Sequence, residues 1–366
     1  MTTRRDFLQI GAGTLAGLAF VGCDLLAARP AATLPRRREV VANGRRVKTV
    51  DVHAHCAVPE ALSLMNLKLG GAALPPVLHV ATQAADRIRA MDEQGIDVEA
   101  LSINPFWYKA ERDLARQIIS VQNEKLAEAC AAHPDRFVAF ATVALQHPDL
   151  AAEQLEDGVK RLGLRGAAIG GSVNGEEISD PRFHPFWAKA EQLGVLVFIH
   201  PQGAGVAADI PKRLKGNGYL DNVIGNPLET TIALSHLIFE GTLDRFPGLK
   251  ICGAHAGGFL PSYAGRSGRG CPTRPDACPG GTYGPIKKKP SDYLKQMYYD
   301  TMVFSAEGVR HLAAEVGAGQ LLVGTDFPYP WTTTAVDVIL DAPGVSDADK
   351  VAMLGGTAMR LLGIRA

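Results

Sequence analysis

The chain has 366 residues, of which 46% are hydrophobic, and its 38 basic residues balance its 38 acidic residues. This length suits one large α/β barrel with a substantial core. The balanced charge argues against nucleic acid as a partner and against electrostatic binding to a membrane. The six cysteines form no Cys-x-x-Cys pair and show no zinc-finger spacing.

Residues 1–30 have the pattern of an export signal. Arg4 and Arg5 form a twin-arginine pair, and an apolar run follows from residue 10 to residue 21. That run is too short to span a bilayer as a mature helix, but it suits a signal peptide. Two processing routes stay open: cleavage near Ala27, or lipidation of Cys23 in a lipobox-like sequence. We expect a periplasmic or otherwise exported protein that contacts the membrane only through a lipid at Cys23.

After this signal comes a short linker and then a long alternation of strand and helix patterns. Residues 31–46 are rich in Ala, Pro and Arg and are predicted to be the linker. Eight strands are predicted in the remainder, at residues 49–55, 98–103, 137–145, 166–170, 196–200, 249–255, 298–304 and 321–326. Helices are predicted at residues 84–94, 110–132, 150–162, 186–193, 227–246, 308–316 and 347–362, and a long loop at 56–80.

The predicted strands are nearly continuous apolar runs. Such runs are typical of a parallel sheet that is buried on both faces. Eight of them, most followed by a helix, predict a single (β/α)8 TIM barrel over residues 47–366.

Polar side chains end four of the predicted strands. His53 and His55 end the first strand, and a spacing of two residues places them on the same face. His200 ends the fifth strand, His255 the sixth and Asp326 the eighth. Because strand ends of a parallel barrel meet at one rim, these five side chains converge, and a divalent cation would satisfy them together.

These residues resemble the metal-dependent amidohydrolase superfamily. The resemblance is to the amidohydrolase-2 branch that includes 2-amino-3-carboxymuconate 6-semialdehyde decarboxylase, and it covers about residues 48–364. It is carried by five motifs: Asp51-x-His-x-His55, Met91 to Val98, His200-Pro201, Leu249 to Gly258, and Gly324-Thr-Asp-Phe-Pro328. The resemblance implies a TIM barrel of the metal-dependent hydrolase type.

The resemblance also implies a metal site. Its ligands are His53, His55, His200 and Asp326, which bind a divalent ion, zinc or alternatively manganese. The fourth predicted strand ends in residues 168–171, Ala-Ile-Gly-Gly, which offer no ligand for a second ion. We therefore expect one metal ion per chain.

His255 and Asp326 are the expected catalytic groups, because each can hold a proton beside a metal-bound water. We predict that the protein is a carbon-carbon lyase that decarboxylates a small unsaturated or aromatic carboxylic acid. The ligand set alone leaves two alternatives open. One is a metal-dependent hydrolase of a lactone, ester or amide, and the other is a non-catalytic periplasmic protein that binds a metal or ligand.

Two residues are candidates for binding the substrate. Arg266 matches a family position from which an arginine reaches across a dimer interface, so we expect a homodimer and a small carboxylate substrate. Trp107 follows the second predicted strand and could stack on the substrate, with packing under a loop as the alternative. Pro75 stands where the aminocarboxymuconate enzyme has a second arginine, which argues against that particular substrate.

Cys271 and Cys278 flank a proline-rich loop. In a compartment outside the cytoplasm they could form a disulfide.

Overall fold

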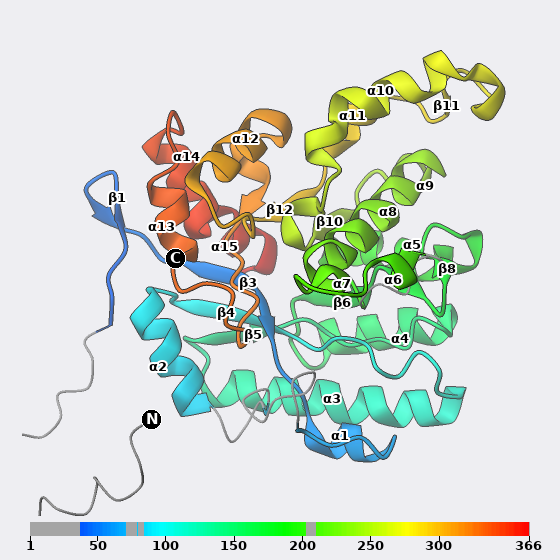
Figure 1. The fold of residues 1–366 in the computed structure, drawn as a ribbon. Coiled ribbons are helices and arrows are strands. Elements are labelled where there is room, and N and C mark those ends of the chain that lie inside the picture. Colours follow the sequence, from blue (N-terminus) through cyan, green and yellow to red (C-terminus); the bar gives the residue numbers. More distant parts are fainter. Residues whose placement is uncertain (1–36, 71–78, 80–83, 203–209, 366) are drawn as a thin grey trace, which may run out of the picture. The chain divides into compact units, whose positions relative to one another are not determined.

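The computed structural model describes residues 37–70, 79, 84–202 and 210–365. Within these ranges, eight parallel strands build a barrel (Figure 1). The strands are β3 (Val50–His55), β4 (Val98–Ser102), β5 (Phe137–Ala139), β6 (Gly166–Gly170), β9 (Leu196–His200), β10 (Lys250–Gly253), β12 (Tyr298–Asp300) and β13 (Leu321–Leu322). All eight coincide with predicted strands, so the expected TIM barrel is confirmed.

The barrel closes through two bridges. Strands β3, β4 and β5 form one parallel sheet, and strands β6, β9, β10, β12 and β13 form another. The pair Ala141 and Ala167 joins the end of β5 to β6, and the pair Asp51 and Val323 joins β3 to the end of β13. The amide of Val52 also donates to the carbonyl of Val323 at 2.9 Å. Eight strands therefore form one closed ring, and their carboxyl ends meet at one mouth.

Helices surround the barrel and occupy its loops (Figure 1). Those before β10 are α1 (Pro59–Ser63), α2 (Ala84–Gln94), α3 (Arg112–Ala132), α4 (Pro148–Lys160), α5 (His184–Leu193), α6 (Ile210–Arg213), α7 (Leu220–Val223), α8 (Gly225–Phe239) and α9 (Thr242–Arg245). Those after it are α10 (Ala264–Thr273), α11 (Pro290–Leu294), α12 (Ala306–Val316), α13 (Ala335–Leu340), α14 (Asp347–Val351) and α15 (Thr357–Leu362). None of the described helices has the length and apolar character needed to cross a membrane.

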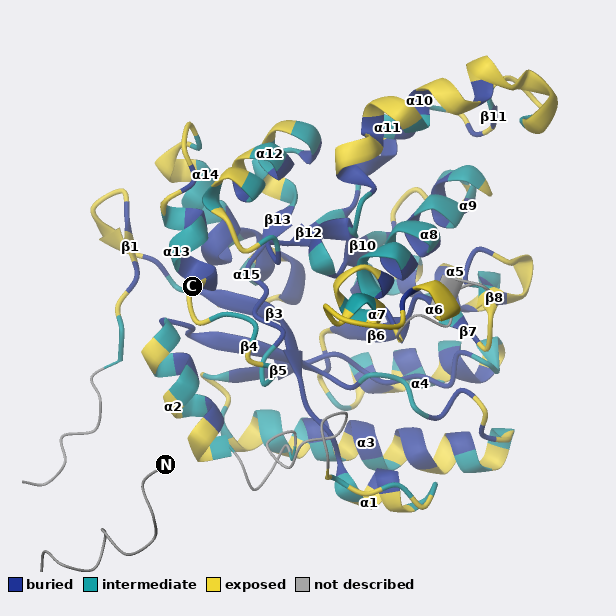
Figure 2. Cartoon of the chain, viewed as in Figure 1, coloured by how far each residue is buried: buried dark blue, intermediate teal, exposed yellow. Residues whose placement is uncertain are grey.

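Most of the core falls into two layers, one inside the strands and one between the strands and the helices. The barrel strands are buried along most of their length (Figure 2). The inner layer includes Val50, Val52 and Phe198, all fully buried. A bulge shifts the pairing of β3 with β4 by one residue between Asp51 and Ala54. Because a bulge re-aims side chains, Val52 and its neighbour His53 both contact the inner layer, where the His53 ring lies 5.1 Å from that of Phe198.

The structure contains elements that the sequence pattern did not predict, and it interrupts predicted helices. The predicted linker contains a short antiparallel hairpin, β1 (Val41–Ala42) with β2 (Arg45–Arg46), and the predicted loop after β3 contains α1. The closing helix is divided by a π-helical turn at Ala352–Gly356. A small excursion that the sequence pattern missed, α10 with β11 (Thr282–Pro285) and α11, projects from the barrel between β10 and β12 (Figure 1).

Candidate metal centre and active site

The predicted ligands meet at the mouth of the barrel. The last residue of β3, His55, places its Nε2 atom 3.1 Å from Nε2 of His53 and 2.8 Å from Oδ1 of Asp326. His200, the last residue of β9, lies with its ring centroid 4.5 Å from that of His55. One ligand atom from each of these four residues lies within 4.8 Å of all the others. The structure thus brings together the four side chains that the sequence predicted as ligands.

The polar atoms of this cluster are satisfied by a cation better than by one another. Both ring nitrogens of His200 are buried without a hydrogen-bond partner in the described part of the chain, and Oδ1 of Asp326 is buried against Nε2 of His53 at 3.2 Å and Nε2 of His55 at 2.8 Å. Buried polar atoms without partners are unfavourable unless an ion or water binds them. Three imidazoles and one carboxylate form a donor set that suits zinc or manganese. The chain therefore carries a site for a divalent metal ion.

Asp300, the last residue of β12, supports the site through hydrogen bonds to His53 and to the turn at His255. Its Oδ2 accepts a hydrogen bond from Nδ1 of His53 at 2.7 Å, which leaves Nε2 of that histidine directed at the ligand cluster. The same carboxylate accepts the backbone amides of His255 at 2.9 Å and Ala256 at 2.8 Å. One buried carboxylate thus orients a metal ligand and the turn that carries His255. The sequence analysis missed Asp300, because the predicted strand ran on to residue 304 and placed Asp300 in its interior, whereas β12 ends at Asp300.

Asp51 performs a similar role on the other side of His53. Its Oδ2 accepts a hydrogen bond from Oγ1 of Thr325 at 2.5 Å, and its Oδ1 accepts the amide of His53 at 2.9 Å. Because Thr325 precedes Asp326, this contact ties two ligand-bearing strands together. Gly324 makes the close approach feasible, since a Cβ there would lie 2.7 Å from Cβ of Asp300 and 3.2 Å from Cβ of His53.

Electrostatics prepare three of the four ligands for a cation, whereas His53 must release a proton before it can bind one. Burial lowers the pKa of His55 and His200, so both are neutral imidazoles that can bind a metal. Burial also opposes charge on His53, but Asp326 and Asp300 outweigh it and raise the pKa of His53 to about 10. Burial would raise the pKa of Asp326, yet the adjacent histidines hold it well below its usual range. Asp326 is therefore ionised and supplies negative charge to a bound cation.

His255 lies beside the ligands but outside their set. Its ring centroid is 5.2 Å from those of His53 and His200, and its Nδ1 atom has no hydrogen-bond partner among the described residues. Its backbone is left-handed, with φ of 51°, a conformation that is uncommon for a non-glycine residue and clusters at functional sites. Burial, together with His53, lowers its pKa to about 4. A neutral imidazole in this position can accept a proton from a group at the metal.

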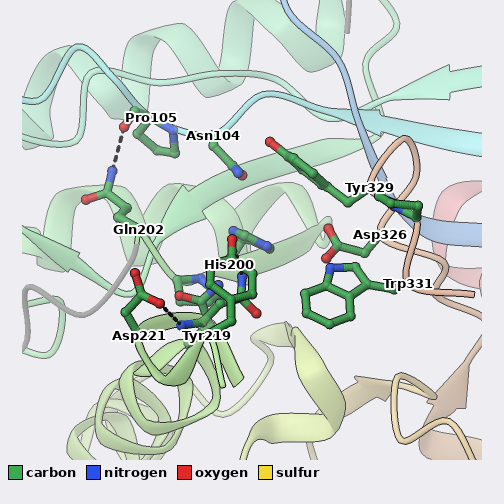
Figure 3. Close-up of a pocket in the computed structure, with 13 residues that line it drawn as sticks. Asn104, Pro105, His200, Gln202, Tyr219, Asp221, Asp326, Tyr329 and Trp331 are labelled. Carbon is green, nitrogen blue, oxygen red and sulfur yellow. Dashed lines mark hydrogen bonds between the residues drawn. The ribbon is translucent and has the colours of Figure 1, made fainter. Parts of the chain in front are cut away.

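A cavity of about 620 Å³ opens above His200 and Asp326 (Figure 3). Its walls come from the loops after β4, β9 and β13, and they include polar and aromatic side chains. The lining residues are Asn104, Pro105, His200, Pro201, Gln202, Tyr219, Asp221, Asn222, Asn226, Asp326, Tyr329, Pro330 and Trp331. The sequence analysis did not find Tyr219 or Trp331, because they lie in loops without periodicity.

The prediction that Trp107 binds the substrate is wrong. The indole is fully buried, its Nε1 donates to the carbonyl of Val143 at 2.9 Å, and it belongs to the outer core layer. The alternative of packing under a loop is therefore correct. The loop after β4 instead contributes Asn104 and Pro105 to the cavity.

The remaining predicted residues lie apart from the metal. Arg266 is exposed on α10 and does not line the cavity of its own chain. Cys271 and Cys278 form a disulfide in the projecting excursion. Cys23 and Pro75 lie outside the described residues.

Comparison with known proteins agrees with this geometry. The family model described as Amidohydrolase matches residues 50–364. The chain is 31% identical over 281 residues to a 2-amino-3-carboxymuconate-6-semialdehyde decarboxylase from Dictyostelium discoideum, covering 76% of each chain. It is 30% identical over 332 residues to a gamma-resorcylate decarboxylase from Rhizobium sp., covering 85% of this chain and 97% of that one. A dihydroxybenzoic acid decarboxylase from Polaromonas sp., solved with manganese and 2-nitroresorcinol, shares 27% identity with a TM-score of 0.75, over 87% of this chain and 98% of that chain.

The barrel and its ligand set define a metal-dependent α/β-barrel enzyme. The chain belongs to the amidohydrolase family, in the branch of 2-amino-3-carboxymuconate-6-semialdehyde decarboxylase and gamma-resorcylate decarboxylase. The family expected from the sequence motifs is thereby confirmed.

Proposed function

We propose that this enzyme decarboxylates a small aromatic or unsaturated carboxylic acid. The observation that carries the proposal is the position of the complete ligand set, His53, His55, His200 and Asp326, at a cavity with the aromatic walls Tyr219 and Trp331. Aromatic side chains suit a planar substrate. The relatives named above are all decarboxylases of such acids, which supports the same reaction class here.

The chain's own residues have distinct roles in this proposal. The four ligands that would hold the metal ion are His53, His55, His200 and Asp326. When bound, the ion would act as a Lewis acid that polarises the carboxylic acid substrate. His255 carries a proton between the site and the carbon from which carbon dioxide leaves, because its free Nδ1 lies beside the ligands. Asp300 fixes His53 and the His255 turn, so that both keep their orientation during turnover.

One metal ion per chain is part of the proposal. The end of β6, residues 168–171, carries no side chain that could bind a second ion. Manganese is bound by a relative of similar fold, and zinc fits the same donor set. Elemental analysis of protein purified without added metal should give about one equivalent and identify the ion. A reproducible value near two equivalents, both bound at this site, would contradict the proposal.

The reaction is tested on metal-loaded protein with a panel of hydroxybenzoates and lactones. We expect release of carbon dioxide from at least one carboxylate, loss of this activity after chelation, and recovery when manganese or zinc is restored. Hydrolysis of a lactone, ester or amide without release of carbon dioxide would instead establish a hydrolase. Tight binding with no turnover of any compound would indicate a protein that only binds ligands.

We also propose that the protein is exported by the Tat pathway and acts as a homodimer. The support for export is the Arg4-Arg5 pair before a short apolar run. Replacing both arginines by lysine should retain the enzyme in the cytoplasm in fractionated cells. Unchanged export would contradict the Tat route. Radiolabelled fatty acid incorporated in the wild type but not in Cys23→Ser would establish the lipid anchor.

A further inference from the structure

A second, smaller compartment adjoins the main cavity. Its volume is about 230 Å³, and it meets the main cavity at shared lining residues that include Asn226, Asp326 and Trp331. His200 lines only the larger compartment, His255 lines only the smaller one, and Asp326 reaches both. The two compartments therefore meet at Asp326, one of the four metal ligands, so a molecule bound beside Asp326 can extend into either.

The smaller compartment is more apolar than the larger one. Apart from His255, the walls that belong to the smaller compartment alone are Val223, Pro227, Gly258, Phe259, Met302, Val303 and Phe304. The larger compartment instead presents Asn104, Gln202 and Asp221. Val223 is 47% exposed and Phe304 is 50% exposed. Large apolar side chains held open at a cavity, rather than folded into the core, indicate an apolar ligand group that covers them.

Trp331 separates the two compartments. Its ring lies 6.2 Å from that of Tyr219 at an interplanar angle of 11°, and 6.0 Å from that of Phe304 at 35°. Tyr219 lines only the larger compartment and Phe304 only the smaller one, whereas Trp331 lines both. Figure 3 shows Tyr219 and Trp331 in the larger compartment. The indole thus lies where the two compartments meet, between an aromatic residue of the larger one and an aromatic residue of the smaller one.

The charges of the lining residues restrict what can occupy the site. Across the described ranges, neither compartment is lined by a lysine or an arginine of this chain. The larger compartment instead carries the carboxylate of Asp221. Within one chain, a second carboxylate on the substrate would therefore face no cation and would lie near the carboxylates of Asp221 and Asp326. The walls of this chain favour uncharged substituents beside the reacting carboxylate, and an arginine for a carboxylate would have to come from the neighbouring subunit.

We infer that the smaller compartment binds an alkyl group carried ortho to the carboxyl group of an aromatic substrate. The inference rests on the proposed decarboxylation, in which the reacting carbon lies between the metal ligands and His255. Because His255 itself lines the smaller compartment, a group that fills it is attached next to that carbon. A volume of about 230 Å³ exceeds what a methyl group fills, so the compartment has room for a chain of several carbons.

The test compares two probes, salicylate and 6-propylsalicylate, on the full-length manganese-loaded protein. Dissociation constants are measured by calorimetry, and release of carbon dioxide is measured separately. The propyl derivative should bind about 10- to 200-fold more tightly, as expected for apolar groups that enter a fitted pocket. Val223→Phe fills the compartment and should reduce this preference at least about tenfold. Val223→Ser, which removes apolar surface without adding volume, should reduce it in the same direction.

The matched control is Val41→Phe, because Val41 is 53% exposed and lies on β1, away from the mouth. It should leave the ratio of the two affinities unchanged. Equal binding of the two acids to the wild type would overturn the inference, and so would equal weakening of both acids by Val223→Phe. If the wild type binds 6-propylsalicylate more tightly, and this depends on Val223, while neither acid is decarboxylated, the inference about the compartment is supported. The proposed decarboxylation is then contradicted.

Discussion

Nδ1 of His53 donates a hydrogen bond of 2.7 Å to Oδ2 of Asp300, and both side chains are fully buried. Carboxylates in this position fix the tautomer of a metal-binding histidine and strengthen its bond to the ion. Asp300→Asn should therefore lower the affinity for the metal by about 10- to 100-fold. Competition with a fluorescent chelator measures this change directly.

The control for this variant is Asp292→Asn, which removes a carboxylate from an exposed position on α11. It should bind metal as the wild type does. If Asp300→Asn keeps full affinity, Asp300 only anchors the turn through the amides of His255 and Ala256.

His255 can be separated from the ligands by mutation. Because it lies outside the four-residue ligand set, His255→Ala should keep about one metal ion per chain. Loss of a proton-transfer group should lower kcat by about 10²- to 10⁴-fold. Metal content and kcat are measured on the same preparation of the variant. The control is His236→Ala on α8, which removes a side chain of the same size outside the site and should change neither quantity. Loss of the metal together with activity would make His255 a ligand instead.

A buried ion pair supports the loop behind the metal. Nη1 of Arg87 donates to Oε2 of Glu99 at 2.7 Å, and both side chains are 2% exposed. Nη2 of Arg87 also donates to the carbonyl of His55. Arg87→Met leaves an unpaired buried carboxylate and should destabilise the fold by about 3–5 kcal/mol. The double variant Arg87→Met/Glu99→Leu should recover most of this loss in urea unfolding.

The same pair predicts a pH dependence. Burial raises the pKa of Glu99 in the folded protein, and Arg87 opposes that shift. When folding raises the pKa of a carboxyl group, the folded protein holds that proton more tightly than the unfolded chain does. The protein therefore loses stability as pH rises above the pKa that the group has in the unfolded chain. The difference between the wild type and Arg87→Met should therefore be small near pH 4 and grow toward pH 7. A difference that stays constant over this range would show that the lost hydrogen bond to His55 dominates.

The sequence predicted the strands and ligands because both depend on local patterns. The apolar runs of the eight strands are continuous in sequence, and strand ends of a barrel must meet at one mouth, which identified His53, His200 and Asp326. Asp300 was missed because the predicted strand ran on past it, and a single carboxylate carries no sign of its partner. Its partner, His53, lies 247 residues away.

The loops could not be predicted in the same way. Trp107 follows β4 closely, yet its loop turns back so that the indole reaches the carbonyl of Val143. The residues that do form the wall, Tyr219 and Trp331, belong to loops whose conformations depend on contacts between distant segments. Tyr219 also has a left-handed backbone, with φ of 54°, which its residue type does not predict.

The last prediction concerns Arg266 in a dimer. No arginine or lysine lines the cavity within the described part of the chain, and Arg266 is exposed on α10 with no ion-pair partner among the described residues. If the neighbouring subunit supplies this arginine, Arg266→Ala should weaken binding of the substrate carboxylate by about 10- to 100-fold, since a charge-assisted bond contributes roughly 1.5–3 kcal/mol. Metal content should not change. Arg269→Ala, also exposed on α10, is the matched control.

Mixed dimers test the sharing of the site. Arg266→Ala and Asp326→Ala chains should each be nearly inactive alone, the first through its missing arginine and the second through its missing ligand. After subunit exchange, a mixed dimer contains one site with metal ligands from the Arg266→Ala chain and the arginine from the Asp326→Ala chain. That site is complete, so up to about a quarter of wild-type activity should return, because half of the dimers are mixed and each has one working site. If exchange is demonstrated by mass and no activity returns, Arg266 does not complete its neighbour's site.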